Sequence, residues 1–189
     1  AEYAFDPEAV ENVACWLVYV YEYDGTSWNH TRELVPNEGV AGLGFGSSLA
    51  FDGNRAVVAS FGNPLADIDA PVCIFRRDSG TGSWAREVRF VPPTTGRNSH
   101  TYRRVSIAAG RMAVSDPYDD RFASCAGIAW VYRLCPDGLW RMVSVLSSPN
   151  LDAYNWFGSA VAVHPSGILV GEERSNRLAE TSGDVFVFR

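Results

Sequence analysis

The sequence predicts an all-β fold made of repeated antiparallel sheets. Tryptophan recurs 56 residues apart at Trp28, Trp84 and Trp140. Two further sets of apolar positions keep this spacing: Leu34, Phe90 and Leu146, and Leu49, Val105 and Val161. The segments between them are short, rich in Val, Phe and Tyr, and separated by Gly, Asp and Pro, as strands and turns are. Four-stranded antiparallel units at such a fixed period are typical of the blades of a β-propeller.

The best-preserved unit covers residues 45–93. Its first two strands are joined by Asp52-Gly53, a pair that supplies the positive φ of a tight hairpin. The predicted strands are 49–51, 56–59, 72–76 and 84–91. The alternating apolar residues of these strands must be covered by neighbouring units, because one sheet cannot bury both of its faces.

The other units follow the same plan less completely. The next has strands at 105–108, 112–114, 128–133 and 140–146, and the last has strands at 161–163, 168–170 and 185–189 with no fourth strand. A leading unit supplies strands at 17–23 and 28–35. We therefore expect one domain, 1–189, that forms a small or incomplete propeller. It contains three complete-to-partial repeats plus a leading partial blade. The blades are expected at about 1–40, 45–95, 101–150 and 157–189. A β-sandwich is the alternative, but it gives no reason for the recurring tryptophan.

The first fourteen residues allow two interpretations. Residues 3–6 resemble residues 49–52, which favours a first strand of the leading blade and hence four blades. Residues 6–11 also resemble a helix opening, with Asp6 as N-cap and Pro7 in the first turn. In that case thirteen strands form an open arc.

Composition excludes several classes of function. The chain of 189 residues has a net charge of −6, which argues against binding to nucleic acid or to anionic membranes. Its longest apolar run, residues 16–21, has the length of a strand, so we expect no membrane insertion. Because the chain begins at Ala1 without Met, we expect a processed chain or a piece of a longer one.

The cysteines and histidines do not form a recognisable reactive pattern. Cys15, Cys73, Cys125 and Cys135 show no C-x-x-C spacing, and Cys73 falls in an apolar strand where a buried thiol is expected. Cys125 and Cys135 flank a predicted strand that holds them too far apart for a disulfide. His30, His100 and His164 are dispersed, and residues 42–46 have the glycines of a turn rather than of a phosphate loop. We expect no catalytic activity.

Carboxylates gather in the loops between second and third strands. These are Asp67 and Asp69, then Asp116, Asp119 and Asp120, then Glu172 and Glu173. Oxygen ligands on loops suit calcium, but Asx turns in a solvated loop also explain them, so we expect no metal or other cofactor. Equivalent loops meet at one end of a propeller, which makes Tyr118, Asp119 and Asp120 candidates for partner contact.

The recurring tryptophans also allow two interpretations. An exposed aromatic ring in each blade could stack on a sugar, as in glycan-binding propellers. A ring at the start of each fourth strand could instead pack between blades, which is the more usual role of periodic aromatic residues.

The segments 45–50 (Phe-Gly-Ser-Ser-Leu-Ala) and 157–162 (Phe-Gly-Ser-Ala-Val-Ala) resemble the start of FG-GAP repeats. Residues 115–120 look like a diverged Gly-Ala-Pro loop of that family, and the strand endings Phe75-Arg76, Tyr132-Arg133 and Phe188-Arg189 also fit. Such repeats form the propeller of integrin α subunits and occur in bacterial surface proteins. The chain lacks the Asp-x-Asp-x-Asp-Gly calcium loop and is too short for seven blades.

This resemblance implies a propeller scaffold with a binding role. We therefore expect a non-catalytic protein–protein interaction module, as in cell adhesion, located extracellularly or at the cell surface. An open blade edge is a template for another strand, so we expect a protein partner or self-association there, unless the N-terminus closes the ring. A glycan-binding lectin of similar architecture is the alternative.

Overall fold

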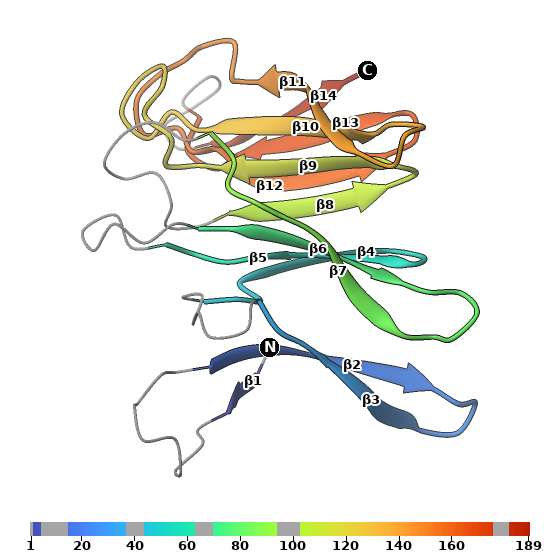
Figure 1. Cartoon of the computed structure of the whole chain (residues 1–189). Helices are drawn as coiled ribbons and strands as arrows, with labels where there is room; N and C mark the ends of the chain where they lie inside the picture. Colours follow the sequence, from blue (N-terminus) through green and yellow to red (C-terminus); the bar gives the residue numbers. More distant parts are fainter. Residues whose placement is uncertain (1, 5–14, 37–43, 63–69, 94–102, 176–181) are drawn as a thin grey trace.

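The fold is entirely β in the part of the chain that the structure describes. This computed structural model describes residues 2–4, 15–36, 44–62, 70–93, 103–175 and 182–189 (Figure 1). Within these ranges fourteen strands form four antiparallel sheets, and no residue is helical. Accordingly, no helix of the described residues is long and apolar enough to cross a membrane.

The two middle sheets each contain four strands in chain order. Sheet II consists of β4 (Ser48–Asp52), β5 (Arg55–Ala59), β6 (Val72–Arg77) and β7 (Trp84–Phe90). Sheet III consists of β8 (Arg104–Ala108), β9 (Arg111–Asp116), β10 (Ile128–Leu134) and β11 (Trp140–Leu146). The predicted hairpin between β4 and β5 is present, with Gly53 at φ 59°. These two sheets confirm the four-stranded unit expected from the 56-residue period.

The two outer sheets each contain three strands. Sheet I consists of β1 (Glu2–Ala4), β2 (Cys15–Tyr23) and β3 (Trp28–Leu34), and sheet IV of β12 (Phe157–His164), β13 (Gly167–Glu172) and β14 (Asp184–Phe188). Within the described residues sheet IV has no fourth strand, as predicted. Figure 1 shows the blue strands of sheet I at one end of the molecule and the strands of sheets III and IV, yellow-green to red, overlapping at the other.

Strand β1 corrects the expectation for the N-terminus. It pairs with β2, with Tyr3 opposite Trp16, and these residues lie 56 positions before Ala59 and Val72, which pair in sheet II. β1 therefore occupies the second-strand position, and the assignment of residues 3–6 to a first strand is wrong. The repeat period decides the position, whereas a four-residue likeness does not. The possible helix opening at 6–11 lies outside the described residues, which themselves contain fourteen strands against the thirteen of that alternative.

Three apolar clusters lie between successive sheets. The face of each sheet that points to the following sheet is called here its leading face, and the opposite face its trailing face. Val57 and Ile74 on the leading face of sheet II pack against Val105 and Trp130 on the trailing face of sheet III. The remaining clusters join sheet I to sheet II around Val18, Leu34, Val58 and Phe75, and sheet III to sheet IV around Ala129, Val131, Phe157 and Val170. The core is thus a series of inter-sheet layers, as the repeat predicts.

The first strands of sheets II, III and IV lie side by side. β4 lies beside β8, and β8 beside β12. Serine hydroxyls connect these strands: Ser48 Oγ accepts the N–H of Val105 at 3.1 Å, and Ser106 Oγ accepts the N–H of Val163 at 2.9 Å. Within the described residues sheet I has no strand in this position. β4 therefore has no first strand beside it on the side of sheet I, whereas β8 has β4 beside it.

Candidate functional site

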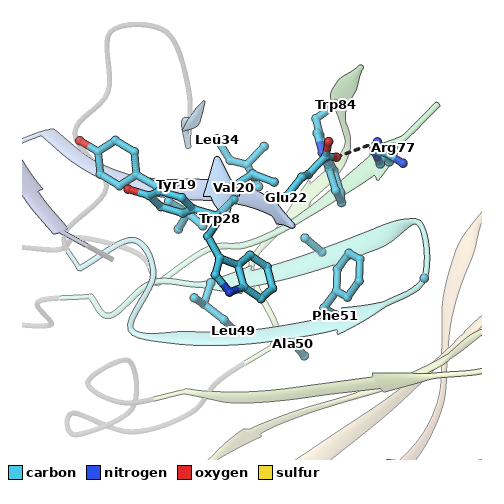
Figure 2. A pocket seen from close by; sticks show the side chains of 14 residues that line it. Tyr19, Val20, Glu22, Trp28, Leu34, Leu49, Ala50, Phe51, Arg77 and Trp84 are labelled. Carbon is cyan, nitrogen blue, oxygen red and sulfur yellow. Dashed lines mark hydrogen bonds and ion pairs between the residues drawn. The ribbon is translucent and has the colours of Figure 1, made fainter. Parts of the chain in front are cut away.

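An apolar groove lies between sheets I and II. Its volume is about 500 Å³, and it is bounded by β2 and β3 on one side and by the β4–β5 hairpin on the other (Figure 2). Side chains that line it include Val18, Val20, Leu34, Leu49, Phe51 and Trp84. The groove is larger and more apolar than the loop cleft described below, which makes it the first candidate for a binding site.

Among the described residues, β4 has no first-strand neighbour on the side that faces the groove. Leu49 and Phe51 are 48% and 62% exposed, whereas their repeat equivalents on β8, Val105 and Ile107, are 6% and 7% exposed. The residues on β8 are covered by sheet II, and those on β4 point into the groove. The exposure of two large apolar side chains is therefore a local interruption of an otherwise repeated interface.

An ion pair connects the two sides of the groove. Arg77 Nη2 of β6 lies 2.7 Å from Glu22 Oε1 of β2, and Figure 2 shows this pair as a dashed line. The rings of Phe51 and Trp84, both of sheet II, are 6.1 Å apart between centroids and pack together on one side of the groove. The ion pair therefore joins sheets I and II beside an apolar wall.

The three periodic tryptophans differ in environment. Trp84 packs against the cluster between sheets I and II, and Trp140 against the cluster between sheets II and III, so both follow the packing interpretation. Trp28 is exposed beside the groove. Sugar stacking therefore remains a prediction for Trp28 alone.

The predicted loop residues lie around a second, polar cleft. Tyr118 contacts Trp156, with ring centroids 5.5 Å apart, and the cleft of about 310 Å³ is also lined by Arg104 and Glu173. The guanidinium of Arg174 lies 3.8 Å from the ring centroid of Trp156, a cation–π contact that orders the rim. The structure thus places Tyr118 at a cleft at the loop end of sheets III and IV, and its role in partner contact stays a prediction.

Asp119 and Asp120 serve the loop itself. Asp119 is buried, and its Oδ1 accepts the N–H of Arg121 at 2.9 Å, while Asp120 Oδ1 accepts the N–H of Cys125 at 2.8 Å. Asp116 Oδ1 accepts the N–H of Tyr118 in the same way. This is the Asx-turn interpretation of the acidic loop. The carboxylate of Asp119 is directed into the loop rather than toward solvent, and its proposed partner contact stays an untested prediction.

The other acidic residues do not assemble a cation site in the part of the chain that the structure describes. No group of three or more His, Cys, Asp or Glu side chains there could hold a metal ion, and Asp67 and Asp69 lie outside that part. Glu172 is buried, accepts a hydrogen bond from Ser148 Oγ at 3.2 Å, and has its pKa raised by burial. Its neighbour Glu173 is exposed on the cleft.

The remaining candidate residues have structural surroundings. Cys73 is buried, as predicted, and burial raises the pKa of its thiol, while Cys125 is also buried and Cys135 is half-buried. His164 and Ser166 hydrogen-bond at 2.7 Å within the β12–β13 turn, His30 is exposed on β3, and His100 lies outside the described residues. The described end of the glycine-rich segment 42–46 is a turn before β4, closed by the bond from Ser47 N to Gly44 O.

A comparison with family models locates one repeat precisely along the chain. The model described as FG-GAP repeat matches residues 140–188, from β11 to β14, a segment that includes Phe157-Gly158-Ser159. Residues 140–188 are an FG-GAP repeat. FG-GAP repeats generally take part in protein–protein interaction and adhesion. A comparison with curated proteins returned no match.

The sequence pattern does not reveal the groove, which lies outside residues 140–188. Leu49 and Phe51 fall in an ordinary predicted first strand, and nothing local distinguishes them from Val105 and Ile107. The difference in exposure comes from the neighbouring sheet and not from the strand itself.

Proposed function

We propose that the chain is a non-catalytic, propeller-type binding module whose four sheets act as blades and whose partner is a protein. The single observation that carries this proposal is the FG-GAP repeat at residues 140–188, and the exposed apolar face of sheet IV supplies a surface for the partner. An extracellular or cell-surface location and a role in adhesion belong to the same proposal, because FG-GAP repeats are typical of domains in that setting.

The leading face of sheet IV is apolar and uncovered. Val185 and Val187 on β14 are 66% and 59% exposed, and Leu169 on β13, which pairs with Val187, is exposed as well. On the other side of β14, Phe186 and Phe188 pack against Phe157 in the cluster between sheets III and IV. The strand is therefore apolar on both sides, although only one side is covered.

The equivalent face of sheet III shows what such a surface does elsewhere in the molecule. Ala113 and Val131 pair with each other as Leu169 and Val187 do, and they are buried against sheet IV. Their burial stabilises the sheet contact by removing apolar surface from water. An uncovered face of the same kind on a folded protein marks an interaction site. A further protein surface can cover this face in the way that sheet IV covers sheet III.

The test is a comparison of Val187→Lys with Val143→Lys, a matched change at an exposed valine of β11. Each chain is measured for molar mass by light scattering across a concentration series, and used as bait in quantitative affinity purification. We expect self-association or a stoichiometric partner for the wild type and for Val143→Lys, and its loss for Val187→Lys. A monomer with the same set of bound proteins for all three chains would refute the proposal.

A further inference from the structure

We propose that the polar cleft at the loop end of sheets III and IV binds a neutral sugar, with one pyranose ring packed against Trp156. The cleft has a volume of about 310 Å³. Its lining residues come from both sheets and from the segment that joins them: Arg104, Pro117, Tyr118, Trp156, Ser159 and Glu173. None of them belongs to the apolar set on the leading face of sheet IV, so this site and the proposed protein partner can be tested separately.

Trp156 stands at a backbone position that suits glycine. Its φ is 59°, in the left-handed region that is unfavourable for bulky side chains. Two periods of 56 residues earlier the chain has Gly44, with φ 58°, and both residues directly precede a Phe-Gly pair. The turn needs the left-handed conformation, which glycine adopts without strain. A tryptophan in this place is therefore explained by a role of its ring and not by the turn.

The equivalent space beside Gly44 is closed by the protein itself. A Cβ built on Gly44 would overlap the ring of Phe61, so this ring occupies the space next to the glycine. Two periods after Phe61 the chain has Glu173, which is exposed and lines the cleft together with Trp156. A phenylalanine against a glycine in one unit is thus replaced by a glutamate and a tryptophan around an open space in another. The repeat alone does not require the cleft.

The position of Trp156 is fixed before any ligand binds. Its N–H donates to Cys125 O at 3.2 Å, and its carbonyl oxygen accepts the N–H of Ser159 at 3.1 Å. The guanidinium of Arg174 lies 3.8 Å from the ring centroid, and the ring of Tyr118 lies 5.5 Å away between centroids. A ring that is already ordered loses little side-chain entropy when a ligand packs against it.

The cleft offers both hydrogen-bond donors and acceptors. The guanidinium of Arg104 can only donate, the carboxylate of Glu173 can only accept, and the hydroxyl of Ser159 can do either. In addition, Nε1 of Trp156 is buried and has no hydrogen-bond partner among the described residues. A buried donor without a partner is rare in folded proteins, so this one is a further group that a ligand could satisfy.

A neutral sugar matches this combination of groups. Its hydroxyls both donate and accept, so one ring can bond to Arg104 and Glu173 together while its C–H face packs against Trp156. An anionic ligand would be repelled by Glu173, and a cationic ligand by Arg104 and Arg174. An apolar ligand would leave the charged groups desolvated and unpaired. The cleft therefore favours a ligand that is polar, uncharged and partly covered by C–H groups.

Saturation-transfer NMR with methyl pyranosides measures this binding. The probes are the methyl glycosides of glucose, galactose, mannose, fucose and N-acetylglucosamine, and we expect at least one of them to bind saturably. Trp156→Gly should weaken that binding about tenfold or more, because it removes the ring and keeps a residue suited to the backbone. Glu173→Gln should weaken it about threefold, since an amide oxygen still accepts a hydrogen bond.

Trp28→Ala is the matched control, because Trp28 is an exposed tryptophan beside the groove between sheets I and II and not in the cleft. It should leave pyranoside binding unchanged. Circular dichroism and thermal melting verify that the three variants are folded. A glycan array then distinguishes the two sources of a pyranose: binding to immobilised glycans assigns a sugar carried on a larger molecule, and binding of the methyl glycosides alone assigns a free sugar.

Three results would overturn the sugar site: no saturable binding of any pyranoside, equal binding by the wild type and Trp156→Gly, or loss of binding in Trp28→Ala. Saturable binding of acetate or of tetramethylammonium in place of the pyranosides would equally reject a neutral ligand. The proposed protein partner is judged by Val187→Lys in affinity purification. Failure of the sugar site therefore leaves that proposal standing, and failure of the partner leaves the cleft as it is.

Discussion

Gly127→Ala is expected to be one of the most damaging single-methyl changes in this protein. Gly127 has φ 81° and bridges to Phe157 at the start of β12, which joins sheet III to sheet IV. A Cβ at this position would lie 2.1 Å from the carbonyl oxygen of Phe157 and 2.8 Å from its nitrogen. Both contacts are with backbone atoms, so no side-chain rotation can relieve them.

The expected magnitude comes from two contributions. Placing alanine at positive φ costs about 1 kcal/mol. To restore an ordinary contact of 3.4 Å, Phe157 must move away by roughly 1.3 Å, which disrupts the hydrogen bond from its N–H to Ala126 O, now 3.0 Å long. An unmade buried hydrogen bond costs about 1–3 kcal/mol. We therefore expect Gly127→Ala to lower the free energy of unfolding by about 3 kcal/mol.

Gly138→Ala is the matched control. Gly138 has φ 82°, and a Cβ built on it meets no atom within 4 Å, so it isolates the backbone contribution of about 1 kcal/mol. Urea unfolding of the three chains gives the free energies, and thermal melting should show a decrease of about 6–12 °C for Gly127→Ala against about 2–4 °C for Gly138→Ala. Equal losses in the two variants would refute the argument that close packing of sheets III and IV at Gly127 decides the cost.

Three further predictions concern buried groups. Because burial raises the pKa of Glu172 above its usual 4.5, the stabilising contribution of this side chain is complete below pH 4.5 and is lost as the pH rises through the raised pKa. Glu172→Gln should therefore raise the melting temperature at pH 7 and leave it unchanged at pH 4. A gain of the same size at both pH values would contradict this reasoning. Burial and a raised thiol pKa should make Cys73 resist alkylation by iodoacetamide until urea unfolds the chain, whereas Cys135 should react in the folded state. Peptide mass mapping of the alkylated chain measures both reactions. Labelling of Cys73 before unfolding would count against its buried placement. Trp140→Ala should lower the free energy of unfolding, measured in urea, by about 2–4 kcal/mol, and Trp28→Ala should lower it by less than about 1 kcal/mol. The reason is that, of these two side chains, Trp140 packs against an inter-sheet cluster and Trp28 is exposed. Equal losses would reject the packing assignment.

The sequence predicts most of the fold because each strand carries its own periodic signal. Trp28, Trp84 and Trp140, spaced 56 residues apart, mark the first residue of β3, β7 and β11, the strand in the fourth position of each repeat unit. Asp24 and Asp78 mark the turns before it, where each carboxylate accepts two backbone N–H groups, which lowers its pKa. These features are local, so the order of residues is enough to reveal them.

Exposure at the candidate sites is not a local property and was predicted less well. Asp119 follows Tyr118 in an acidic, loop-like segment, yet its carboxylate is buried in the loop's own hydrogen bonds. Leu49 and Val105 occupy the same repeat position and differ only in whether a neighbouring sheet covers them. A sequence pattern can assign the face on which a residue lies, but the presence of a covering sheet depends on residues far away along the chain.

The two exposed apolar surfaces of the described residues differ in shape. On sheet IV, Val185 and Val187 lie on the open face of a sheet, so contacts there are made by side chains. Between sheets I and II, Leu49 and Phe51 line a groove whose other side is formed by β2 and β3. A charge at Val187 should therefore disturb a contact between sheet faces, whereas a charge at Leu49 should affect only a group that enters the groove.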